Sequence, residues 1–167
     1  EFTGLTYNGT FLTAMSTSPR YYYILNPDVG THDLVISTNG EHQINIKGYL
    51  IAYGLKQQAP NAYAASQGEG LNPTDDIITT VDNTYVLDTV FGEDSGPYGC
   101  TMDVHTGRTA IYESVSSPRV GASYLSVPTA ATQTLSWTFG AGNNWYVSLS
   151  AWELATDGTA APMETIL

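Results

Sequence analysis

The feature that most constrains this fold is a strict two-residue alternation near the end of the chain, over residues 132–154. Apolar side chains there occupy every second position, between threonine, serine and tyrosine. Successive side chains of a β-strand point to opposite faces, so the pattern predicts two strands that each bury one face. The glycine- and asparagine-rich stretch at 140–144 tolerates the φ angles that reverse a chain. We therefore predict a β-hairpin, with Trp137 and Trp145 in the core.

The rest of the chain carries the same signature in shorter pieces and shows no helical periodicity. Asn8-Gly9 is the strongest short hairpin signal. Two stretches, 59–74 and 92–107, lack periodicity and predict long connections. Strands are predicted at 5–7, 10–14, 21–25, 31–37, 43–53, 77–81, 84–91, 109–114 and 123–127.

About ten short strands separated by turn signals predict an all-β fold, a jelly-roll or Greek-key β-sandwich of antiparallel strands. A chain of 167 residues is long enough to bury one core, so we expect a single domain over residues 1–155. Residues 156–167 show no strand partner. We predict that they form a C-terminal tail that could contact another subunit or a partner.

The charge balance excludes several classes of partner. The chain has 5 Lys and Arg against 16 Asp and Glu, for a formal net charge of −11. Binding to nucleic acid or to an anionic membrane surface needs basic side chains, so we expect neither. No apolar run approaches the roughly 20 residues that a membrane-spanning helix needs, so membrane insertion is not predicted. Cys100 is alone, which excludes an internal disulfide.

Several phrases together resemble a loose family of jelly-roll β-sandwich modules, found in secreted bacterial surface proteins and in phage structural and tail-associated proteins. They are LTYNG at 5–9, YYYILNPDVGTHDLVIS at 21–37, TTVDNTYVLD at 79–88 and the alternating run at 132–154. NPDVGTH at 26–32 is the most specific. The resemblance covers residues 5–154 and implies a β-sandwich with a display role and no catalytic residues. In the strand predicted at 31–37, His32 is expected to face the same side as Leu34 and Ile36.

Aromatic side chains are the first candidates for ligand binding. The chain has 12 Tyr and 3 Trp. Tyrosine and tryptophan anchor protein interfaces, and their exposed ring faces stack on sugars. Tyr146 and Trp152 fall on the serine side of the last strand, and Tyr22 is the middle ring of a tyrosine triplet. We predict these three as candidate ligand-binding residues, for a protein or a glycan.

Acidic side chains in two turn-rich regions are the second candidates. Calcium prefers six to eight oxygen ligands from carboxylates, carbonyls and amides. If the fold brings the two regions together, they could form a calcium site; no other cofactor is expected. The candidate ligands are Asp75, Asp76, Glu93, Asp94 and Asp103.

No catalytic constellation is visible, so no catalytic residues are predicted. The function predicted is a non-enzymatic structural or adhesive module on a virion, as a decoration or tail-associated protein, or on a cell surface. Its expected partners are further copies of itself or a capsid, tail or surface scaffold. The alternatives are a carbohydrate-binding module, an extracellular filament subunit completed by strand donation, and a glycosidase, which would need two converging carboxylates.

Overall fold

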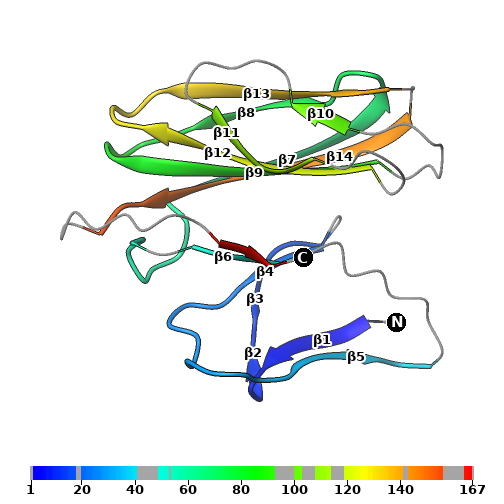
Figure 1. The fold of residues 1–167 in the computed structure, drawn as a ribbon, viewed down its shortest axis with the longest axis vertical. Helices are drawn as coiled ribbons and strands as arrows, with labels where there is room; N and C mark the ends of the chain where they lie inside the picture. Colours follow the sequence, from blue (N-terminus) through cyan, green and yellow to red (C-terminus); the bar gives the residue numbers. More distant parts are fainter. Residues whose placement is uncertain are drawn as a thin grey trace. The chain divides into compact units, whose positions relative to one another are not determined.

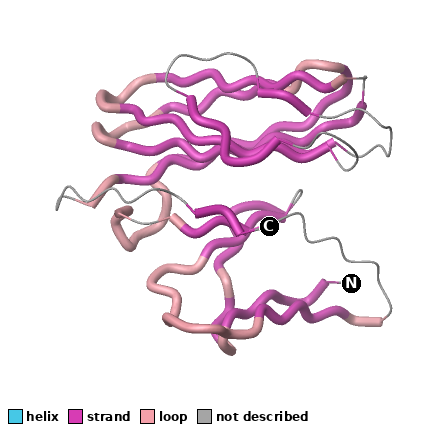
Figure 2. The backbone as a smooth tube through the Cα atoms, viewed as in Figure 1, coloured by secondary structure: helices cyan, strands magenta, loops and turns pink. Residues whose placement is uncertain are grey.

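The computed structural model describes residues 2–17, 20–40, 49–52, 54–92, 100–102, 108–113, 119–140, 143–155 and 164–166. Every regular element in these ranges is a β-strand and every strand pairing is antiparallel, which confirms the all-β prediction (Figure 2). Contacts divide the chain into two compact units, residues 1–47 and 48–167. The predicted domain over 1–155 and tail over 156–167 stay a prediction.

The first unit contains a three-stranded and a two-stranded sheet. The three-stranded sheet has the order β2-β1-β5, and β3 pairs with β4. The strands are β1 (Phe2–Tyr7), β2 (Thr10–Phe11), β3 (Thr13–Thr17), β4 (Arg20–Tyr23) and β5 (Leu34–Thr38). Asn8 and Gly9 join β1 to β2 with φ angles of 47° and 76°, so the predicted Asn-Gly hairpin is confirmed.

The second unit contains a five-stranded sheet with the order β11-β12-β9-β14-β7 and a three-stranded sheet with the order β10-β13-β8. Figure 1 shows these two sheets stacked as layers. A further pair is formed by β15 and β6. The strands are β6 (Tyr49–Ile51), β7 (Ala62–Gly70), β8 (Thr74–Ile78), β9 (Thr84–Gly92), β10 (Cys100–Met102), β11 (Arg108–Glu113), β12 (Arg119–Val127), β13 (Thr132–Phe139), β14 (Asn143–Glu153) and β15 (Glu164–Ile166).

Strand pairing in the two stacked sheets is nested. The strand β7 pairs with β14, β8 pairs with β13, and β9 pairs with β12, so early strands take late strands as neighbours. Consecutive strands from β7 to β10 alternate between the five-stranded and the three-stranded sheet. The two layers are therefore linked by several crossings of the chain.

The core lies between these two sheets. Each strand contributes alternate side chains to it, as the period of two requires. Trp137 is fully buried, as predicted, and Trp145 packs against the core while partly buried. The core cluster contains Ile77, Val86, Val90, Leu125, Val127, Leu135, Trp137, Phe139, Val147, Leu149 and Ala151.

The predicted hairpin over residues 132–154 is wrong in its pairing, although both strands exist. The strand β13 pairs with β8 and β10, whereas β14 pairs with β7 and β9 in the other sheet. The alternation of apolar residues indicates which face of a strand is buried, but it does not indicate which strand is the hydrogen-bonded neighbour. Two consecutive strands that bury one face each can therefore enclose the core from opposite sides.

The predicted long connection over residues 59–74 is also wrong, because it contains the nine-residue strand β7. Its core-facing positions carry small side chains, and a Cβ built on Gly68 would lie 2.6 Å from Cζ2 of Trp145. Small residues on β7 complement the large indole on β14, so the buried face of β7 shows no apolar alternation in the sequence.

The C-terminal end is predicted to lack a strand partner, but β15 pairs with β6 in register, with Thr165 opposite Leu50. The predicted strand at 43–53 is described only in part, as β6. Most of the predicted connection at 92–107 lies outside the described residues, apart from β10.

Candidate interaction surfaces

The first candidate is a groove in the first unit, formed where the loop before β5 meets the β1–β2 hairpin turn. It has a volume of about 300 Å³ and is open to solvent. Hydrogen bonds fix its walls: Nδ2 of Asn8 donates to Oδ2 of Asp28 at 2.7 Å, and the backbone N–H of Asn8 donates to the carbonyl oxygen of Asp33 at 3.2 Å. The groove is lined by Asn8, Gly9, Thr31, His32, Asp33 and Val35.

Three apolar side chains of the first unit are exposed, and one of them, Val35, lines this groove. Phe11, Val29 and Val35 are 72%, 96% and 48% exposed. Thr6 is paired with Phe11 on one side and with Val35 on the other, so the two apolar side chains share a face of the sheet. We call these three residues, together with the groove, the hairpin–loop surface. A contiguous exposed apolar patch with a polar rim is typical of surfaces that bind other molecules.

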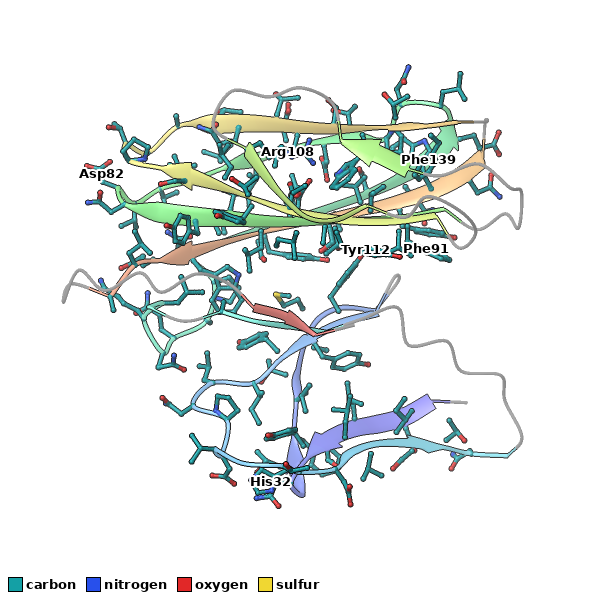
Figure 3. The ribbon with its side chains drawn as sticks, viewed as in Figure 1. His32, Asp82, Phe91, Arg108, Tyr112 and Phe139 are labelled. Carbon is teal, nitrogen blue, oxygen red and sulfur yellow. The ribbon has the colours of Figure 1, made fainter. Side chains whose placement is uncertain are left out.

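His32 lies at this surface and not on a strand, so its predicted strand position beside Leu34 and Ile36 is wrong. The strand β5 begins two residues later, at Leu34. The Nε2 atom of His32 lies 3.2 Å from the carbonyl oxygen of Val29, and its ring meets Tyr7 edge to face at 5.4 Å. These local contacts hold the loop, and Figure 3 shows His32 at the edge of this unit.

A polar cluster is buried between the two sheets of the second unit. The carboxylate of Asp88 on β9 accepts hydrogen bonds from Arg108 on β11, from Ser123 on β12 and from Nε1 of Trp137 on β13, the last at 2.7 Å. Nε of Arg108 also donates to Oγ of Ser123 at 2.7 Å, and Nη1 donates to the carbonyl oxygen of Ser136. The side chains of the ion pair are fully buried.

This cluster joins the two sheets. Burial raises the pKa of the Asp88 carboxyl above its ordinary value, and the charge of Arg108 with the donors on Ser123 and Trp137 acts in the opposite direction. Removing one partner of such a pair leaves the other charge buried and uncompensated. We therefore assign the cluster a role in holding β13 over β9, β11 and β12.

The second candidate is the side of the five-stranded sheet that faces away from the core, which we call the outer face. Phe91 and Tyr146 are paired across β9 and β14 and stack with ring centres 6.2 Å apart. Tyr85 and Tyr124 meet edge to face at 5.6 Å. Figure 3 shows Phe91 and Tyr112 on this side and Arg108 on the other. The aromatic residues of the outer face are Tyr63, Tyr85, Phe91, Tyr112, Tyr124, Tyr146 and Trp152.

Two of the three predicted ligand-binding residues, Tyr146 and Trp152, therefore share this face. Tyr146 is half-buried, but the expectation that Trp152 is a surface residue is wrong, since it is 7% exposed. The backbone N–H groups of Lys56 and Asn61 donate to the carbonyl oxygens of the residues on either side of Trp152. The segment between Lys56 and Asn61 therefore runs beside the end of β14. Whether either residue binds a ligand stays a prediction.

Tyr22, the third predicted ligand-binding residue, lies in the first unit. It sits on β4 opposite Ala14 and is half-buried. The structure therefore does not gather the three predicted aromatic residues on one surface of one unit. Its role in ligand binding also stays a prediction.

The calcium prediction is described only for Asp75 and Asp76, on β8. Asp75 is paired with the core residue Leu135, whereas Asp76 accepts a hydrogen bond from Thr134 on the exposed side. The two carboxylates thus lie on opposite faces of one strand. Glu93, Asp94 and Asp103 lie outside the described residues. Within the described ranges, no three His, Cys, Asp or Glu side chains are grouped as a metal site would need.

Sequence reasoning missed two groups of residues that the fold brings together. Asp88 has the same parity as Val86 and Val90, so its carboxylate lies at a core position. A carboxylate there requires a buried hydrogen-bond donor. That signal could have pointed to Arg108, one of only 5 basic residues. The exposure of Phe11 had no such signal in the sequence.

No helix in the described part of the chain is long and apolar enough to cross a membrane. No protein-family model and no curated protein matches this sequence. Among solved structures, a chain in the structure of the tripod from the baseplate of bacteriophage Tuc2009 is similar over 78% of this chain and 84% of its own length. The two are 13% identical, with a TM-score of 0.36. Similarity of this strength assigns neither a fold nor a function to the chain.

Proposed function

We propose that this chain is a non-enzymatic attachment module of a virion or cell surface, and that it binds a protein partner through the hairpin–loop surface. The observation that carries this proposal is the exposure of Phe11, Val29 and Val35, at 72%, 96% and 48%, in the unit whose polar-walled groove Val35 lines. Binding energy at protein interfaces concentrates in a few apolar and aromatic anchors beside polar groups. An acidic surface poor in lysine and rich in threonine and tyrosine supports display outside the cytoplasm.

We also infer that the two stacked sheets of the second unit form a jelly roll. The support is the nested pairing of β7 with β14, β8 with β13, and β9 with β12. Such nesting results when one long antiparallel ribbon is rolled so that its strands distribute over two sheets. A jelly roll is a rigid support that leaves loops and separate units free to bind.

Charge favours a basic partner. The described cationic side chains of Lys56 and Arg108 are already paired with Glu153 and Asp88. Asp33 lines the groove, so a lysine or arginine on the partner would find a carboxylate there. Complementary charge speeds association and selects among partners more than it adds affinity. The association rate should therefore fall as ionic strength rises.

A carbohydrate-binding role finds less support. Sugar stacking needs open aromatic faces, whereas Trp152 is 7% exposed and the described tyrosines of the outer face are half-buried. A protein partner remains the occupant that the hairpin–loop surface favours.

Hydroxyl-radical footprinting read by mass spectrometry tests the proposal, with the chain assembled on its source particle or cell compared with the isolated chain. We expect Phe11, Val29 and Val35 to lose labelling on assembly. Leu71 and Ile78 in the second unit, 47% and 64% exposed, are matched controls and should keep theirs. Immunogold electron microscopy of the same sample locates the chain on the particle or the cell.

The opposite footprint would refute the proposed docking surface. If Leu71 and Ile78 were protected while the hairpin–loop residues stayed fully labelled, attachment would use the second unit. If immunogold labelling found the chain only inside cells, the display role would be wrong.

A further inference from the structure

The turn between β1 and β2 contains a reactive dipeptide in an exposed position. Asn8 precedes Gly9, and both residues are exposed. Glycine has no Cβ, so its backbone nitrogen is open to the preceding side chain. The same dipeptide recurs after β5 as Asn39-Gly40, also exposed, which gives a reference within the same chain.

Asparagine before glycine undergoes a known reaction in water. The Gly9 nitrogen would lose its proton to solvent base and attack Cγ of Asn8, forming a new N–C bond that closes a succinimide ring. The Cγ–Nδ2 bond would break, and Nδ2 would take a proton and leave as ammonia. Water would then open the ring at either carbonyl carbon, leaving aspartate or isoaspartate.

Asn8 differs from an unconstrained asparagine because its reactive amide is held. Nδ2 donates to Oδ2 of Asp28 at 2.7 Å, and the hydroxyl of Tyr7 donates to the backbone carbonyl of Asp28 at 3.2 Å. The side chain of Asn8 must leave this carboxylate before Cγ can meet the Gly9 nitrogen. The negative charge of Asp28 also opposes the negative charge that develops on the attacking nitrogen.

We propose that Asn8 is a deamidation site that the carboxylate of Asp28 protects. Because the site is exposed, this hydrogen bond should contribute about as much as an ordinary one, which would slow the reaction by about three- to tenfold. The protection depends on one contact between the hairpin turn and the loop that carries NPDVGTH.

Reaction at Asn8 would change the groove that this residue lines. The amide donor facing Asp28 would become a carboxylate, and two like charges at hydrogen-bonding distance repel each other. With Asp33 also in the lining, the groove would become more acidic. Deamidation would thus loosen the contact between hairpin and loop and change what the groove attracts.

The test compares the intact chain with Asp28→Asn and Asp28→Ala variants during incubation in mildly alkaline buffer. Peptide mass spectrometry and enzymatic isoaspartate detection follow Asn8 and Asn39 separately. We expect Asp28→Ala to raise the Asn8 rate by about three- to tenfold, Asp28→Asn to raise it by less because a neutral acceptor remains, and both to leave the Asn39 rate unchanged. Asp28→Asn keeps the size and one acceptor oxygen of the side chain, so it isolates the effect of charge.

The other outcomes of this experiment also support or refute the proposed protection of Asn8. If neither variant raises the Asn8 rate, or if Asn8 in the intact chain already reacts as fast as the same dipeptide in a short peptide, the proposed protection is wrong. If Asp28→Ala raises both rates together, the first unit has opened. The comparison then rests on Asp28→Asn, in which a rise at Asn8 alone supports the proposal and a flat rate refutes it.

Discussion

The guanidinium carbon of Arg108 lies 4.6 Å from the centre of the Trp137 ring, and both side chains donate to the carboxylate of Asp88. Arg108 and Asp88 belong to the five-stranded sheet, whereas Trp137 belongs to the three-stranded sheet. One buried charged cluster therefore joins the two layers across the core. A cation placed over an indole face adds to this attraction.

Removing one charge of this cluster should be strongly destabilising. We expect Asp88→Ala and Arg108→Met each to lower the free energy of unfolding by about 3–5 kcal/mol, because each leaves a buried charge without its partner. The double variant Asp88→Ala/Arg108→Met should lose less than the sum of the two single variants. Urea unfolding followed by tryptophan fluorescence measures all three, and additive losses would show that the two charges are not coupled.

Gly121 should not tolerate a side chain. A Cβ at this position would lie 2.3 Å from Cζ3 of Trp137, so the indole must move within a packed core. We expect Gly121→Ala to cost about 1–3 kcal/mol in urea unfolding. Ser126→Ala, at an exposed position of the same strand, is the control and should change stability little. Equal stabilities of the two variants would argue against this packing.

Stability should depend on pH through Glu153. The hydrogen bond from Lys56 lowers the pKa of Glu153 below its ordinary value of 4.5. The folded state then binds this proton less readily than the unfolded state. The stabilisation is therefore complete above about pH 4.5 and is lost as the pH falls through the lowered folded-state pKa.

The measurement is the urea midpoint of the intact chain and of Glu153→Gln across the acidic range. The difference between them should be largest near neutral pH and should shrink on acidification. Burial raises the pKa of Asp88, so its contribution to the pH dependence has the opposite sign, but it is present in both proteins and cancels. A difference that stayed constant with pH would contradict the assignment to Glu153.

Phe11 should matter for binding and little for folding. Its side chain is 72% exposed, so Phe11→Ser should change the free energy of unfolding by no more than about 0.5 kcal/mol. Attachment to the source particle or cell should weaken clearly, measured by co-sedimentation of the purified chain with stripped particles or cells. Ile78→Ser is the matched control, and equal binding by the two variants would count against the hairpin–loop surface.

Much of the fold can be predicted from the sequence, because it follows from interactions between residues that are close in the chain. The period of two in β13 and β14 identifies the buried positions, including Trp137, because a strand must turn alternate side chains to opposite faces. The Asn8-Gly9 turn is readable for the same kind of reason, since those residues adopt positive φ at low cost. From the acidic composition we also predict that nucleic acid is not a partner, because carboxylates repel phosphates, and this stays a prediction.

The pairing of strands and the complementary packing of their side chains could be determined only from the tertiary structure. The assignment of β13 and β14 to different sheets depends on distant strands, and the strand β7 was hidden because Gly68 leaves room for Trp145. The partner of Asp88 and the exposure of Phe11 likewise depend on residues far away in the chain. A sequence fixes the preferences of each segment by short-range sterics and solvation, whereas contacts between segments are chosen by the packing of the whole chain.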